Sequence, residues 1–140
     1  MELTRTSQRP HGWIAALLAV ALLAASSGVV AQNLKSGELV YEESCSACHK
    51  KGMAKAPKLG DQKAWARLIK EGQPGITAHG WVGVRLMPPR GGDSELSLEE
   101  FARATAYMAR NSGADWRDPD AAMMQAIRSE EKKYLAKAQK

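Results

Sequence analysis

The two cysteines of this 140-residue chain lie three residues apart, in the pentapeptide Cys45-Ser46-Ala47-Cys48-His49. Residues with this spacing stand on neighbouring turns of one helical face, so both thiols point to the same side. The histidine comes next around the helix and brings an imidazole to the same region. Because three reactive side chains share so short a segment, the rest of the chain has to be arranged around whatever they hold.

This spacing is typical of covalent attachment of a c-type haem. Two thiols placed in this way reach the two vinyl groups on one side of a porphyrin and form thioethers. The histidine can then supply an axial nitrogen to the iron. We therefore predict one covalently bound haem c, attached to Cys45 and Cys48 and coordinated by His49.

Three other kinds of site use similar residues. A thioredoxin-like dithiol needs a preceding strand and a βαβ context, neither of which the sequence indicates. A structural zinc site needs a fourth ligand, for which the chain beyond residue 31 offers only His79 as a conventional one. A disulfide across so short a loop gains little chain entropy and leaves His49 unexplained.

Residues 1–31 have the pattern of a signal peptide. Arg5 and Arg9 form a positive region, an apolar stretch runs from Ile14 to Ala25, and Ala31 is the small residue that a signal peptidase prefers. The alternative is an uncleaved anchor, because the segment continues to Ala31 without a charged residue. Export to the periplasm agrees with haem attachment, since bacteria form the thioethers outside the cytoplasm.

The remaining chain has helical signals and no convincing alternation of β-branched residues. A capping box formed by Ser97 and Glu100 marks the clearest helix start. Helices are expected from Ser36 into His49, from Asp61 to Gly72, from Ser97 to Asn111 and from an N-cap at Asp118 onward. We predict an all-α fold, with a haem domain over 32–112 and a C-terminal helical extension over 113–140.

Residues 72–96 contain many glycines and prolines and predict a long loop, which in a compact domain is usually functional. The iron needs a sixth ligand or keeps an open position. Met87 lies in this loop, far enough along the chain to cross the haem, and Pro88 and Pro89 stiffen the backbone that presents it. We predict Met87 as the sixth ligand, with His79 or an open, water-bound position as the alternatives.

Further motifs occur in the order of a known family. They are Tyr41, the pentapeptide, Ala56-Pro57-Lys58-Leu59-Gly60-Asp61, Trp65, Met87-Pro88-Pro89-Arg90-Gly91-Gly92 and Tyr107-Met108. In this pattern, residues 36–109 resemble class I c-type cytochromes, most closely the bacterial cytochrome c5 family. The resemblance implies a small monohaem cytochrome c fold in which the first and last core helices cross. It also implies that the Pro57 carbonyl accepts a hydrogen bond from His49 and orients the imidazole.

These features predict an electron carrier and not an enzyme. With His49 and Met87 both bound, the iron has no open coordination position, so the protein is not expected to bind a small-molecule substrate. The expected partners are transient redox proteins of a periplasmic, respiratory-type chain. Lysines near the attachment site either steer a partner with an acidic patch or are simply solvated; they are Lys50, Lys51, Lys55, Lys58 and Lys63.

Two alternative functions stay open. The first is a haem subunit stably docked in a respiratory or sulfur-oxidising complex, through the C-terminal helix or an uncleaved anchor. The second is a haem enzyme with a labile sixth ligand, such as a peroxidase or gas binder. A membrane contact is expected only if residues 1–31 stay uncleaved. Nucleic-acid binding is not expected, because the net charge of +5 is spread along the chain without a reading motif.

Overall fold

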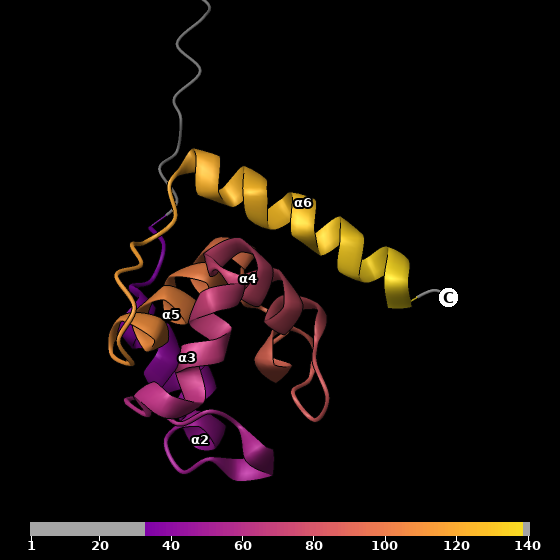
Figure 1. The fold of residues 1–140 in the computed structure, drawn as a ribbon. Helices are drawn as coiled ribbons and strands as arrows, with labels where there is room; N and C mark the ends of the chain where they lie inside the picture. Colours follow the sequence, from indigo (N-terminus) through magenta and orange to yellow (C-terminus); the bar gives the residue numbers. More distant parts are fainter. Residues whose placement is uncertain (1–32, 139–140) are drawn as a thin grey trace, which may run out of the picture. The chain divides into compact units, whose positions relative to one another are not determined.

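Helices make up the regular structure of residues 33–138, which are the residues that the computed structural model describes (Figure 1). Within this range, the only strand-like pairing is an isolated bridge between Val84 and Met87. The prediction of an all-α fold is confirmed. The signal-peptide prediction for residues 1–31 lies outside the described residues. Among the described helices, none is both long enough and apolar enough to span a membrane.

The first predicted helix is present but changes type along its length. α1 (Gly37–Val40) is capped by the Ser36 hydroxyl, which accepts a hydrogen bond from the Leu39 amide. A π-helical segment, η1 (Tyr41–Cys45), follows, and α2 (Ser46–His49) completes the stretch. π-Helical turns widen a helix locally and often occur at functional sites. Here the wider turn directly precedes the segment that carries the second cysteine and the histidine.

The next two predicted helix starts are also observed. After the short 3-10 segment η2 (Met53–Lys55), α3 (Gln62–Glu71) begins at Asp61, whose carboxylate accepts from the Ala64 amide. α5 (Leu98–Arg110) begins with the capping box, in which the Ser97 hydroxyl and Glu100 carboxylate bond each other's backbone amides. One face of α5 is buried, and it is formed by Leu98, Phe101, Ala102, Thr105, Met108 and Ala109.

α1 packs against α5, as the resemblance implied for the first and last core helices. Gly37 is buried at this contact, where an added Cβ would overlap the backbone carbonyl of Arg103. The rings of Tyr41 and Tyr107 lie next to each other, with centroids 5.6 Å apart. A residue without a side chain is therefore required at this contact between the two helices.

The predicted loop over 72–96 is wrong in its first half, where α4 (Gln73–Val82) forms. Pro74 lies in the first turn of the helix, where no intrahelical N–H is needed. Gly80 is buried against the ring of Phe101, so the absence of a side chain lets the ring pack closely on the helix. Thr77 and Ala78 are fully buried. Tertiary burial thus outweighs the low helix propensity of the glycines. Residues 83–96 remain irregular apart from the 3-10 segment η3 (Pro89–Gly92).

α6 (Ala121–Ala138) packs on α4 (Figure 1). It starts at Asp120, whose carboxylate accepts from the Met123 amide at 2.8 Å, and not at Asp118 as predicted. The reason is that the Asp118 carboxylate is paired with Arg110 at 2.9 Å and does not cap the helix.

Replacing Gly37 by alanine should lower the free energy of unfolding by about 2 kcal/mol, because the added methyl group forces α1 and α5 apart. Gly75→Ala is the matched control, since a Cβ at Gly75 meets no atom within 4 Å. Urea unfolding of the holoprotein, followed by circular dichroism, measures both variants. Equal unfolding midpoints for the two variants would contradict the close contact at Gly37.

Candidate haem-binding site

The two cysteines differ in their surroundings. Cys45 is 7% exposed and ends the π-helical segment, whereas Cys48 is exposed on α2. Both are free thiols, as thioether formation requires. Burial is the main cause that raises the pKa of the Cys45 thiol to about 11, so this thiol is protonated at neutral pH. The helical stretch carries both thiols on one continuous backbone.

His49 ends α2 with its ring held in place. Its Nδ1 lies 2.9 Å from the Pro57 carbonyl oxygen. The carbonyl can only accept, so Nδ1 carries the proton and Nε2 keeps a free lone pair, the form of imidazole that binds a metal. His49 is only 7% exposed, so the packing around the ring also restricts its rotation.

The loop that supplies the Pro57 carbonyl is fixed at both ends. The Leu59 amide donates to the His49 carbonyl at 2.9 Å. The indole N–H of Trp65 on α3 donates to the Lys58 carbonyl at 2.9 Å, and Trp65 is 2% exposed. Trp65 is among the motifs of the family resemblance, but the sequence did not predict this contact. A tryptophan two turns after the loop is the sequence signal that could have indicated it, because a buried indole N–H usually finds a hydrogen-bond partner.

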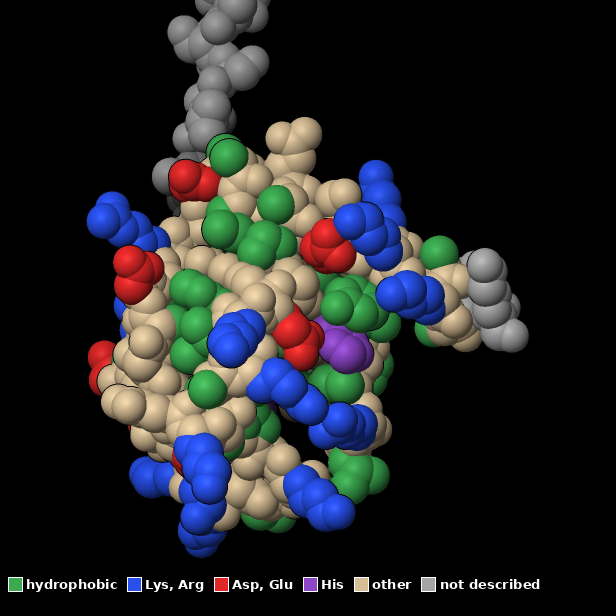
Figure 2. Space-filling view, in the orientation of Figure 1, with side chains coloured by type: hydrophobic (Ala, Val, Ile, Leu, Met, Phe, Trp, Pro, Cys, Tyr) green, Lys and Arg blue, Asp and Glu red, His purple; other side chains and the backbone are tan. Residues whose placement is uncertain are grey.

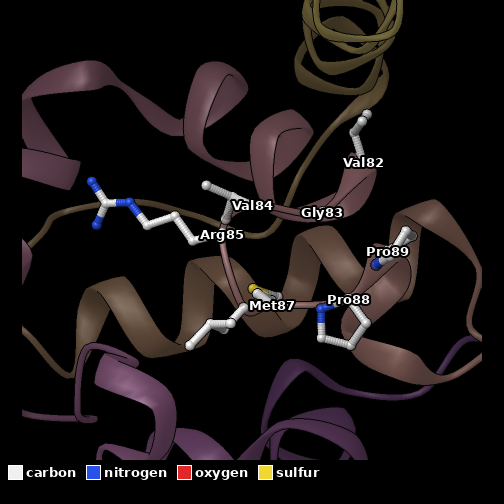
Figure 3. Close-up of a pocket in the computed structure, with 8 residues that line it drawn as sticks. Val82, Gly83, Val84, Arg85, Met87, Pro88 and Pro89 are labelled. Atoms are coloured by element: carbon white, nitrogen blue, oxygen red, sulfur yellow. The ribbon is translucent and has the colours of Figure 1, made fainter. Parts of the chain in front are cut away.

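Met87 lies in a tight turn that follows α4. Backbone hydrogen bonds join Val84 and Met87 in both directions, at 3.0 and 2.9 Å. Arg85 has a φ of 56°, in the left-handed region, and Pro88 follows the turn in an extended conformation. An open cleft of about 350 Å³ is lined by residues 82–89, and Figure 3 shows Met87 in the turn between Val84 and Pro88. The Met87 thioether is therefore carried by a turn that two backbone hydrogen bonds close and that Pro88 stiffens.

His79, the alternative sixth ligand, is not a loop residue as predicted but lies on α4. Its ring stacks on Tyr134 of α6, with centroids 4.4 Å apart and planes 8° from parallel. The sequence prediction failed here because it placed no helix over 73–82. The imidazole of His79 thus has a packing partner of its own.

The donor set fits a haem c. Two free thiols stand on one helical stretch, and a histidine beside them is oriented with Nε2 available. The hydroxyls of Tyr41 and Thr77 are buried without a hydrogen-bond partner in the described chain, which is uncommon unless water or a bound group supplies one. Over residues 33–138, no group of three or more His, Cys, Asp or Glu side chains could hold a metal ion. The zinc alternative therefore lacks a ligand set in the described part of the chain.

Comparison with known proteins gives the same family. Residues 32–108 match the sequence model of the family described as "Cytochrome C oxidase, cbb3-type, subunit III". Cytochrome c-555 from Chlorobaculum tepidum is 36% identical over 104 residues, covering 71% of this chain and 96% of that protein. Cytochrome c5 from Azotobacter vinelandii is 36% identical over 77 residues, covering 54% of this chain and 93% of that protein.

A solved structure agrees with these relatives. It is titled "Crystal structure of electron transfer complex of nitrite reductase with cytochrome c" and is similar with a TM-score of 0.54 and 38% sequence identity. The similarity covers 57% of this chain and 99% of that chain. The family match ends at residue 108, before α6. The chain therefore belongs to the class I c-type cytochromes, which are electron carriers, and its cofactor is one covalently bound haem c.

Proposed function

We propose that this cytochrome is a periplasmic one-electron carrier whose iron is coordinated by His49 and Met87, with Cys45 and Cys48 forming the thioethers. When bound, the haem supplies the redox-active iron. The observation that carries the proposal is the hydrogen-bonded turn from Val84 to Met87, which presents a thioether on a stiff backbone. Stiffness matters because a thioether is a weak ligand, and a preformed turn spares the entropy of ordering it.

His49 and Met87 have complementary effects in this proposal. The Pro57 carbonyl orients the imidazole and increases its basicity. A methionine ligand stabilises the reduced state and raises the reduction potential relative to a second histidine. Since both axial positions are taken by side chains, peroxide or a gas would first have to displace Met87. This supports a carrier over an enzyme, in line with the relatives.

The pattern of residues 1–31 supports export to the periplasm, followed by a haem domain over 32–112 and an extension over 113–140. A respiratory-type chain is the proposed setting. A haem subunit docked in a larger complex is the second candidate function, which the description of the matching family favours. Co-purification from solubilised membranes separates the two, because a carrier is released in the soluble fraction and a docked subunit remains with its complex.

The proposed partners are redox proteins that dock transiently near the attachment site. The similar solved structure is a cytochrome c in complex with nitrite reductase, which supports a partner of this kind. In Figure 2, Lys and Arg side chains gather over the region where Figure 1 places α2 and the loop that follows it. All five lysines of the predicted cluster are exposed: Lys50, Lys51, Lys55, Lys58 and Lys63. Exposed positive charge of this kind steers an acidic partner.

Replacing Met87 by alanine should abolish the sulfur-to-iron charge-transfer absorption of the oxidised protein, because the thioether is lost. The reduced variant should then bind carbon monoxide. Met53→Ala is the matched control, since Met53 is 55% exposed and follows His49 closely in the chain. Retention of the charge-transfer band by Met87→Ala would contradict the proposed ligand.

Replacing Lys55 and Lys58 together by glutamine should slow electron transfer to an acidic redox protein by about fivefold at low ionic strength. The physical reason is the loss of two positive charges close to the attachment site. The control replaces Lys132 and Lys133 on α6, and stopped-flow kinetics across a salt series measures each protein. A wild-type rate that does not change with salt would rule out steering by these charges.

A further inference from the structure

We propose that α6 positions the sixth ligand: Glu131 on α6 holds the indole of Trp81 at the end of α4, and Trp81 and α4 together fix the segment that carries Met87. The inference rests on the proposed coordination of the iron by Met87. It assigns Glu131 and Trp81 as positioning residues and gives the C-terminal extension a role within the haem site.

α4 supports the Met87 segment directly. A Cβ added at Gly80 would lie 3.7 Å from Met87 Cε and 3.2 Å from the ring of Phe101. The Met87 side chain and the Phe101 ring therefore both pack against the α4 backbone at Gly80. One turn later, Gly83 has a φ of 99°, and a Cβ there would lie 3.0 Å from the Pro89 nitrogen. The last turn of α4 therefore contacts Met87 itself, and its C-cap Gly83 contacts Pro89, two residues further on, so a shift of α4 moves the thioether.

Trp81 joins three elements at this end of α4. Its indole N–H donates to Glu131 Oε1 of α6 at 2.9 Å. The rings of Trp81 and Phe101, on α5, pack edge to face, with centroids 5.5 Å apart and planes at 67°. The guanidinium of Arg90, in η3, lies 4.9 Å from the centre of the indole ring. The indole is thus held by α6 and α5 and in turn holds η3, the segment that follows Met87.

The remaining contacts of α6 keep Glu131 in place. Ile127 is fully buried and Met124 is 8% exposed, and Tyr134 stacks on His79 of α4. Met124 and Ile127 belong to one apolar cluster with residues of α4 and α5. Its buried members are Ala78, Leu98, Ala102, Met124 and Ile127. Because α6 is anchored on both sides of residue 131, the carboxylate is presented to the indole at a fixed position. Figure 1 shows α6 running across α4.

A hydrogen bond to an ionised carboxylate is stronger than a neutral one, and both partners here are partly buried. Losing it frees the indole to rotate and loosens the packing of Arg90 and η3 on α4. The iron–thioether bond is weak, so even a modest loosening makes Met87 easier to displace. The family model ends before α6, which means that this support comes from a part of the chain outside the matched core.

Imidazole binding to the oxidised holoprotein tests the inference, because imidazole binds the iron only after the methionine has left. We expect Glu131→Ala to increase the affinity for imidazole by about tenfold. Glu131→Gln keeps a carbonyl acceptor for the indole N–H and should restore most of the wild-type resistance. Glu130→Ala is the matched control, since the Glu130 carboxylate pairs with Lys133 on α6 itself at 2.7 Å.

Two results would overturn the inference. One is equal imidazole affinity for Glu131→Ala and Glu130→Ala. The other is a Glu131→Gln variant that binds imidazole as tightly as Glu131→Ala, because an acceptor for the indole N–H would then not hold the Met87 segment. The charge-transfer band of the wild-type protein separates this inference from the proposed function. If the band is present and Glu131→Ala binds imidazole as the wild type does, only the inference fails. If the band is absent, Met87 is not the ligand and both fail.

Discussion

The hydrogen bond between His49 Nδ1 and the Pro57 carbonyl is the constraint on which the site depends. It sets the tautomer of the imidazole and ties the end of α2 to the loop that follows. That loop is closed by the Leu59 amide on the His49 carbonyl and is held from α3 by the indole of Trp65. The two cysteines and the proposed axial nitrogen of His49 therefore belong to one rigid part of the chain, and the proposed second ligand comes from elsewhere in the chain.

α4 and its neighbours meet that second requirement. The helix places a glycine against Met87 Cε and ends at Gly83, from which a tight turn leads to the methionine. α5 supports α4 from one side through Phe101, and α6 packs on it through Ile127 and Tyr134. In the proposed arrangement the two ends of the described chain act differently: the first helical stretch binds the cofactor covalently, and the last helix stabilises the segment that carries the exchangeable ligand.

Local signals in the sequence predicted most of the helices correctly. Ser36, Asp61 and Ser97 cap helices where expected, because a side chain that accepts from a nearby backbone amide acts within a few residues. α4 could not be predicted in this way, because its glycines and proline have low helix propensity and only burial against Phe101 and α6 compensates for it. The start of α6 was misplaced for a similar reason, since a tertiary contact with Arg110 occupies the Asp118 carboxylate.

The proposed site residues have local signals in the sequence, whereas their support has none. The pentapeptide is recognised by its spacing, and the prolines after Met87 indicate a stiff segment. Nothing local links Glu131 to Trp81, which lie 50 residues apart in sequence and meet only when α6 packs on α4. Contacts of this kind depend on the fold as a whole.

Coordination of the iron by one imidazole nitrogen of His49 and the sulfur of Met87 is the central claim. X-ray absorption at the iron edge of the wild-type holoprotein tests it most directly, because it reports the elements bound to the metal. We expect one sulfur and five nitrogen neighbours in both the oxidised and the reduced protein. A first shell that contains only nitrogen and oxygen, or only five neighbours, would contradict it.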